Sequence, residues 1–178
     1  MKPLPTLFLC AAGLLGWTVS DLAASSTAAP AADFAALTAA AEWIAEFQVV
    51  DKRCALLADG SIETRYTFST LTPMKGAIPS MHEVRIPGGV VAGRGLHLPG
   101  LPEWATGDRA ILFLSSAGPV RGWRMPVGLG AGAFRVIQDG SGRARVRAAS
   151  AADGPPLVHD YDHFVAAVLA ETGSQASR

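Results

Sequence analysis

The sequence has few cysteines and no surplus of charge, and each absence excludes a class of protein. Only two cysteines, Cys10 and Cys54, occur among 178 residues, which excludes a disulfide-rich secreted scaffold. Lys and Arg together number 15, as do Asp and Glu, so the formal net charge is zero. Because nucleic-acid-binding domains normally carry a basic excess, we expect no nucleic-acid partner.

The N-terminal apolar run is too short for a membrane-spanning helix, which needs about 20 residues. It extends from Leu7 to Trp17, follows a positive start at Met1-Lys2 and precedes the small-residue site Leu22-Ala23-Ala24. This arrangement is typical of a Sec-type signal peptide. We expect residues 1–24 to direct export to the periplasm or the medium, with no membrane attachment after cleavage. An uncleaved anchor is the alternative.

Cys54 is then the only cysteine of the exported chain, because Cys10 lies inside the signal segment. A single cysteine forms no internal disulfide, so we expect a hydrophobic core to hold the fold together. We interpret Cys54 as a half-buried small hydrophobic residue. A reactive or intermolecular thiol is the alternative interpretation.

The sequence also lacks the motifs of familiar enzyme classes. It contains no G-x-S-x-G nucleophile elbow and no H-E-x-x-H zinc motif. Residues 128–133 match the loose G-x-G-x-x-A pattern, but a β-like segment, Phe134 to Ile137, follows where a dinucleotide site needs a helix. We therefore expect a glycine-rich bend between strands, no cofactor and a protein without enzymatic activity.

Alternating apolar and polar residues predict a β-rich domain. Ile62 to Thr70 alternates over its whole length, which is typical of a strand buried on one face. Asp139-Gly140 predicts a tight hairpin turn, and residues 87–107 predict a long loop with one short strand near 95–98. Further strands are predicted at residues 44–50, 82–86, 110–114, 123–127, 133–138 and 143–148.

A helix is predicted on each side of these strands. Residues 34–43 carry an apolar stripe after Asp33, a suitable N-cap, and residues 160–170 carry a second stripe. We predict a low-complexity, disordered linker at 25–32, a single β-rich domain at 33–172 and a frayed tail at 173–178. The domain is expected to be a small, partly open β-barrel of the OB type, or else an irregular β-sandwich, with one helix before it and one after.

Two groups of residues are candidates for a site. The long loop carries Arg94, His97 and Trp104, which we predict as binding-loop residues. His159, Asp162 and His163 have the spacing of metal ligands on a helix. Asp160, however, suits a helix N-cap, which would leave His159 outside the helix, so we predict no metal site.

Several short segments, in this order, resemble a family of uncharacterised exported bacterial proteins, some of them encoded near matrixin-type metalloproteases. The segments are Ala41-Glu42-Trp43-Ile44, Ile62 to Leu71, Met74-Lys75-Gly76, Glu83 to Gly89, Gly100 to Trp104, Gly107 to Leu114 and Val127 to Val136. The resemblance covers most of residues 40–138. It implies an exported protein that acts beside a protease.

The order of Lys75-Gly76, the strand that follows, a loop and the Gly107-Asp108 strand is also similar to the netrin-like, OB-type barrels of tissue metalloprotease inhibitors. Those inhibitors reach the zinc with an N-terminal cysteine, and this chain has none at its expected mature N-terminus. The barrel is therefore carried over as an expectation, and the inhibitory mechanism is not.

The hypothesis that follows is an exported, non-enzymatic binding module of the cell envelope or the secretome. Its expected partner is an exported protease or another envelope protein. A metal-dependent or hydrolytic secreted enzyme is one alternative. A structural or assembly protein of the envelope, which would self-associate through an exposed strand edge, is the other.

Overall fold

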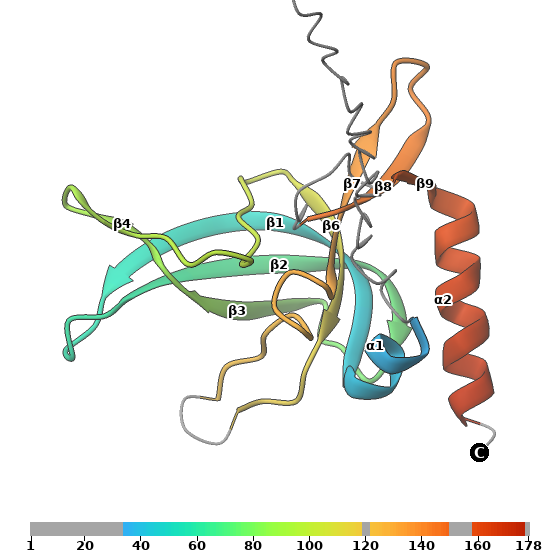
Figure 1. Cartoon of the computed structure of the whole chain (residues 1–178), viewed down its shortest axis with the longest axis horizontal. Coiled ribbons are helices and arrows are strands. Elements are labelled where there is room, and N and C mark those ends of the chain that lie inside the picture. The colour runs from blue at the N-terminus through green and yellow to red at the C-terminus, as the bar shows by residue number, and fades with distance from the viewer. Residues whose placement is uncertain (1–33, 119–121, 150–157, 177–178) are drawn as a thin grey trace, which may run out of the picture.

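The computed structural model describes residues 34–118, 122–149 and 158–176 of the chain. In these residues the protein is mainly β, with nine strands and two helices (Figure 1). The helices are α1 (Phe34–Ala40) and α2 (Tyr161–Ala176). The strands are β1 (Trp43–Leu56), β2 (Ile62–Lys75), β3 (Met81–Pro87), β4 (Gly89–Val91), β5 (Arg94–Leu96), β6 (Arg109–Leu114), β7 (Ala133–Gln138), β8 (Ala144–Ala148) and β9 (Val158–Asp160).

Seven strands form one antiparallel sheet in the order β3-β2-β1-β6-β7-β8-β9, and β4 and β5 form a separate hairpin. The two end strands, β3 and β9, do not pair with each other in the described part of the chain, so the sheet is open. With α1 before the sheet and α2 after it, the predicted partly open, mainly β fold with two flanking helices is confirmed.

The sheet curves because its two longest strands are bent. β1 and β2 each contain 14 residues, and their pairing shifts register at three places, the last of them between Val49 and Asp51. Such bulges bend a strand and increase its twist. The curvature is visible in Figure 1, where the far ends of β1 and β2 reach the β4–β5 hairpin.

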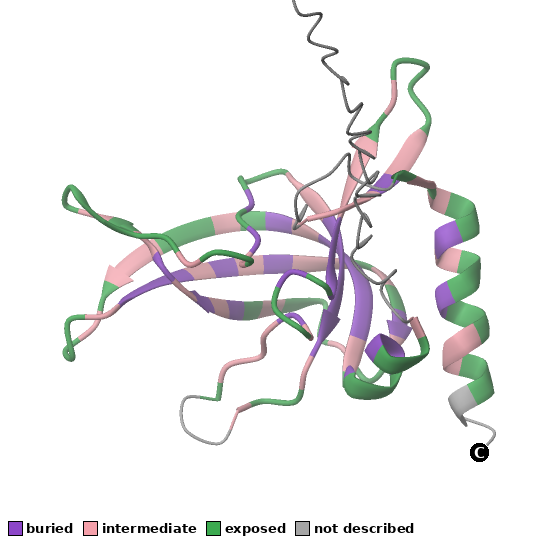
Figure 2. Cartoon of the chain, in the orientation of Figure 1, coloured by how far each residue is buried: buried purple, intermediate pink, exposed green. Residues whose placement is uncertain are grey.

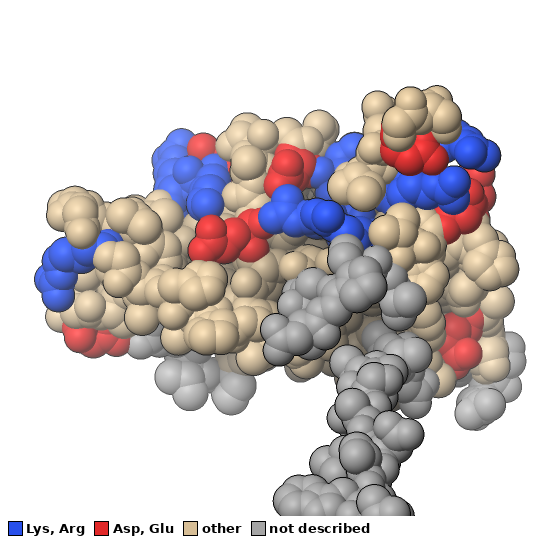
Figure 3. Space-filling model, turned by 45° about the horizontal axis from the view of Figure 1, so that its top comes forward, with Lys and Arg blue, Asp and Glu red and all other residues tan. Residues whose placement is uncertain are grey.

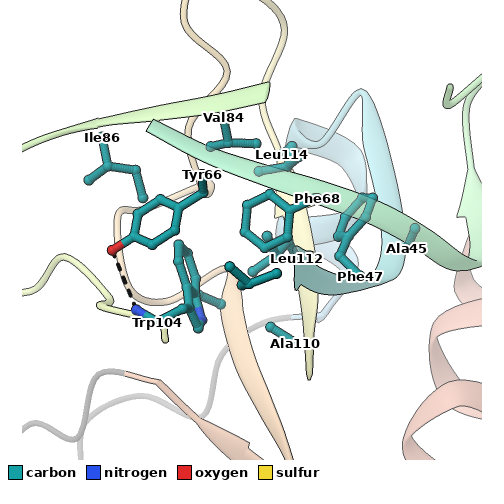
Figure 4. Packing of buried hydrophobic residues seen from close by; sticks show 12 residues of the cluster. Ala45, Phe47, Tyr66, Phe68, Val84, Ile86, Trp104, Ala110, Leu112 and Leu114 are labelled. Atoms are coloured by element: carbon teal, nitrogen blue, oxygen red, sulfur yellow. Dashed lines mark hydrogen bonds between the residues drawn. The ribbon is translucent and has the colours of Figure 1, made fainter. Parts of the chain in front are cut away.

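The sheet has an inner face, on which side chains of neighbouring strands pack against one another and against the loop before β6. Phe47, Tyr66, Phe68 and Leu112 are at most 2% exposed, and Trp104 from that loop lies against Tyr66 and Phe68 (Figure 4). Buried and more exposed residues alternate along the strands (Figure 2), as the Ile62 to Thr70 pattern predicts. Each fully buried aromatic side chain contributes about 1.5–3 kcal/mol.

The opposite face, the helix face, is covered by α1 and α2. Phe113 and Phe134 from the sheet pack with Phe34 of α1 and Phe164 of α2, with ring centroids 4.8–6.4 Å apart. The Phe34 stripe predicted from the sequence therefore does face the core. None of the described helices has the length and apolar character needed to cross a membrane.

Four predicted elements differ from the structure. Residues 123–127 form no strand. Their pairing with β6 is limited to an isolated bridge between Pro126 and Leu114, with hydrogen bonds from Ser115 N–H to the Met125 carbonyl and from Val127 N–H to the Phe113 carbonyl. The loop at 87–107 contains the two-stranded β4–β5 hairpin rather than one short strand at 95–98. α1 ends at Ala40, whereas α2 continues to Ala176, beyond the predicted end at residue 170.

The turns and the remaining strands follow their sequence signals. Asp139 accepts hydrogen bonds from the backbone N–H groups of Ser141 and Arg143, which closes the predicted hairpin between β7 and β8. A hydrogen bond from the Ser141 hydroxyl, together with these backbone bonds and the Arg145 guanidinium, lowers the pKa of Asp139. Residues 128–132 form the predicted glycine-rich bend. The predicted signal segment, the linker and Asp33 lie outside the described residues.

Candidate functional site

A groove lies where β1 and β2 extend beyond β6 and the β4–β5 hairpin folds over the inner face. Its volume is about 390 Å³, which falls within the range of about 300–1,000 Å³ usual for ligand sites. β1 and β2 form its floor, the hairpin forms one wall, and the loop after the hairpin forms the mouth. The lining residues are Lys52, Cys54, Thr64, Tyr66, Gly89, Val90, Gly95, Leu96, His97 and Glu103.

Glycines at the base of the hairpin allow it to approach the floor of the groove. Gly88 and Gly89 have φ angles of +104° and +128°, which side chains with a Cβ rarely adopt. A Cβ on Gly89 would lie 2.4 Å from the Thr64 hydroxyl oxygen and 2.8 Å from Cys54 Sγ. The glycine therefore sets the distance between hairpin and floor.

The polar atoms of the floor are joined by hydrogen bonds. Thr64 Oγ1 donates to the carbonyl oxygen of Gly88 at 2.7 Å, which uses its single proton. The 3.4 Å contact between Cys54 Sγ and Thr64 Oγ1 must then be donated by the thiol. Cys54 is half-buried, as predicted, and its side chain lines the groove.

Tyr66 and Trp104 connect the groove to the core. The Trp104 backbone N–H donates to the Tyr66 hydroxyl at 3.4 Å (Figure 4), and their rings meet edge to face at a centroid distance of 5.1 Å. Burial raises the pKa of Tyr66. Trp104 is 1% exposed and does not line the groove. The prediction of Trp104 as a ligand-contacting loop residue is corrected: its ring packs against Tyr66 and Phe68 within the core of the inner face.

Lys52 supplies the positive charge of the groove. Its ammonium lies 5.6 Å from the centroid of the Tyr66 ring, a cation–π arrangement. It forms no salt bridge with any residue that the structure describes. The sheet arginines Arg53, Arg65 and Arg85, by contrast, each pair with a carboxylate two residues earlier in the chain. A free carboxylate is therefore the natural complement of Lys52.

The mouth of the groove contains a histidine and a carboxylate. His97 Nδ1 lies 3.3 Å from Glu103 Oε1, and both side chains are well exposed. The predicted candidate His97 lines the groove, and its role in binding stays a prediction. Arg94, in contrast, lies on β5 with an exposed side chain and does not line the groove.

The predicted metal candidates do not converge. Asp160 Oδ1 accepts from the backbone N–H groups of Asp162 and His163, so it is the N-cap of α2. His159 lies before this cap, on β9, with its ring against Phe164. Within residues 34–118, 122–149 and 158–176, no three His, Cys, Asp or Glu side chains come together as metal ligands.

Two buried polar groups lie away from the groove. Glu46, 1% exposed, pairs with Arg109 at 2.5 Å and accepts from the Tyr161 hydroxyl at 2.6 Å, which links β1 to the first turn of α2. Burial, with this hydrogen bond, raises the pKa of Tyr161 to about 12. On the inner face, both ring nitrogens of His82 are buried without a partner among the described residues, and burial lowers its pKa to about 4.

The surface shown in Figure 3 carries both signs of charge. Lys and Arg lie beside Asp and Glu across this face. Arg145 on β8 illustrates the pattern, because it pairs with Asp139 at 3.0 Å and Asp160 at 3.2 Å. The groove, rather than this mixed surface, is therefore the better candidate for a specific site.

No protein-family model, curated protein or solved structure matches the chain. The resemblances described above therefore remain predictions, and function has to be argued from the groove. The sequence points to His97 as a loop candidate but to none of Lys52, Thr64 and Tyr66. Their alternating positions on two half-buried strands were the available signal.

Proposed function

We propose that the chain is an exported, non-enzymatic binding module whose groove holds an apolar group with a neighbouring negative charge, presented by a partner protein. The observation that carries the proposal is Lys52, whose ammonium has no carboxylate partner among the described residues and lies beside a groove with apolar walls. Leu96 and Val90 offer that apolar surface at 38% and 67% exposure, and burying it would contribute about 25 cal/mol per Å². An envelope protein, including an exported protease, is the expected class of partner.

Site-specific photocrosslinking in exporting cells tests the proposal. A photoreactive phenylalanine replaces Leu96 in the groove or, as a matched control, Leu169 on α2, which is 46% exposed. The proposal predicts one discrete adduct from position 96 and none from position 169. A Cys54→Trp change, which fills the groove, should abolish the adduct. Equal crosslinking from both positions, or an adduct insensitive to the filled groove, would contradict the proposal.

A thiol-dependent hydrolase is the second candidate, and one observation favours it. Cys54, His97 and Glu103 all line the groove, which brings a nucleophile and a histidine–carboxylate pair to one site. The thiol, however, donates to Thr64 rather than to His97. This candidate predicts turnover of a p-nitrophenyl ester that Cys54→Ala abolishes. The binding-module proposal predicts no turnover above that of the variant.

A further inference from the structure

β1 has neighbours on both sides along only its first half. β6 pairs with Trp43 to Gln48, and the loop before β6 extends this contact to Val49 through Gly107 and Asp108. From Asp51 to Leu56 the pairing is with β2, and no described residue pairs with the other edge. The open edge therefore begins where the groove begins.

The hydrogen-bond pattern of β2 identifies the backbone groups that face this open edge. Thr70 N–H donates toward β3, at Ser80, and Ile62 C=O accepts from Gly88 after β3. Because backbone directions alternate in an antiparallel sheet, the even-numbered residues of β2 from 62 to 70 face β3. Their partners on β1 must face away from β2.

Those partners are Lys52, Cys54 and Leu56, which lie opposite Tyr66, Thr64 and Ile62. The N–H and C=O groups of Lys52 and Cys54 thus point to the open edge, while their side chains line the groove. Main-chain donors and acceptors lie directly beside an apolar groove that contains an ammonium without a salt bridge to any described residue. This combination fits a strand better than a compact small molecule.

We propose that the groove binds an extended peptide segment of the partner protein, which adds as a strand to the Asp51–Leu56 edge of β1. This inference rests on the proposed function and specifies its ligand. Strand addition obtains affinity from main-chain hydrogen bonds and specificity from pockets for alternate side chains. An apolar side chain of the peptide enters the groove against Leu96 and Tyr66, and an acidic side chain two residues away pairs with Lys52.

A second copy of this chain is the other strand that could use the edge. Along this edge its inner-face side chains would be those of Lys52, Cys54 and Leu56, none of which is acidic. Self-pairing would therefore leave both Lys52 ammonium groups without a carboxylate. Charge complementarity favours a foreign acidic segment.

The test begins with the exported protein and a display library of linear nine-residue peptides. A selected peptide is resynthesised with a single backbone N-methyl group at each position in turn. Strand addition predicts that the effect of methylation alternates along the peptide. At every second residue the methyl group removes a hydrogen bond to β1 and clashes with that strand, which should weaken binding at least about tenfold. Methylation at the remaining residues should change the affinity by less than about twofold. This scan leaves the protein itself unchanged.

Proline variants test the protein side. Lys52→Pro removes an N–H that faces the open edge but none that pairs with β2, so the fold should persist, as circular dichroism can show. The matched control is Glu83→Pro on the other edge strand, β3, whose N–H also faces outward. We expect Lys52→Pro to abolish peptide binding, Glu83→Pro to preserve it, and Lys52→Met to weaken only acidic peptides.

Three results would overturn the inference. Binding that tolerates every N-methyl group and Lys52→Pro would mean that the groove takes its ligand without strand addition, which leaves the proposed function intact. A dimer that Lys52→Pro dissociates would identify a second copy as the occupant. Both the inference and the proposed function would be rejected by two negative results together. The library would yield no peptide whose binding is lost in the Cys54→Trp variant, and photocrosslinking from position 96 would give no adduct.

Discussion

Truncation of Trp104 should destabilise the domain far more than its position in a predicted loop suggests. The indole is 1% exposed and meets the rings of Tyr66 and Phe68 at 5.1 and 5.6 Å. Deleting a buried aromatic side chain costs about 3–5 kcal/mol, because the transfer free energy and the cavity both count. We therefore expect Trp104→Ala to lower the free energy of unfolding by that amount.

A second change at the same position separates packing from polarity. Trp104 Nε1 is buried without a hydrogen-bond partner among the described residues, and such a donor costs about 1–3 kcal/mol. Trp104→Phe removes this donor and leaves a void of about 40 Å³, which at about 24 cal/mol per Å³ costs about 1 kcal/mol before the transfer term. The opposing effects nearly cancel, so we expect a change within about 1.5 kcal/mol.

Urea unfolding followed by tryptophan fluorescence and circular dichroism measures both variants. The wild-type m-value should be retained, so that a shift of the midpoint reports stability alone. A Trp104→Ala change that costs less than about 1 kcal/mol would refute the placement of the indole in the core. If Trp104→Phe is as damaging as Trp104→Ala, the indole N–H has a partner and the reasoning about polarity fails.

Three further predictions concern groups at other places in the fold. The pKa of Tyr161 is raised to about 12 in the folded state. The stability that this hydroxyl contributes is therefore present below about pH 10 and is lost as pH rises toward 12. Tyr161→Phe should remove this loss of stability at alkaline pH. Because the pKa of His82 is lowered to about 4, the folded state favours the neutral ring, and stability should fall as pH drops from about 6.5 toward 4; His82→Phe should reduce that slope. Gly89→Ala should displace the hairpin and abolish peptide binding. The control is Gly93→Ala, because Gly93 has a φ of +77° but no atom within 4 Å of an added Cβ. This change should cost only backbone strain of about 1 kcal/mol.

Each of these has a clear contrary result. Denaturant midpoints measured across pH would contradict the first two if the variants kept the wild-type slope in their respective windows. Peptide affinity measured by calorimetry would contradict the third if Gly89→Ala bound as tightly as Gly93→Ala.

The sequence predicts those parts of the fold in which one local signal decides the structure. The alternation from Ile62 to Thr70, the apolar run from Ala110 to Leu114 and the Asp139-Gly140 turn each correspond to an observed element. The β4–β5 hairpin escapes prediction because its strands have three residues each, too few for alternation to be seen. Residues 123–127 are apolar enough for a strand, but their pairing with β6 is limited to the single bridge at Pro126.

The candidate site was predictable only in part, for a physical reason. His97 stands in a conspicuous loop, whereas Lys52 reaches the groove because of the bulge before Asp51 and because the hairpin folds back over β1 and β2. Neither is visible in local sequence patterns. The sequence mispredicts Trp104 because the exposure of an aromatic residue in a glycine-rich loop depends on the strand that it covers, which local patterns do not show.

Amide hydrogen exchange by NMR, in the free protein and in the protein saturated with a selected peptide, tests the central claim most directly. In the free protein, the amides of Lys52 and Cys54 should exchange fast and that of Arg53, which is bonded to β2, slowly. With peptide bound, Lys52 and Cys54 should become protected at least about tenfold, with Glu83 on β3 unchanged. If both amides exchange equally fast with the peptide bound, no strand has been added to β1 and the account of this site is contradicted.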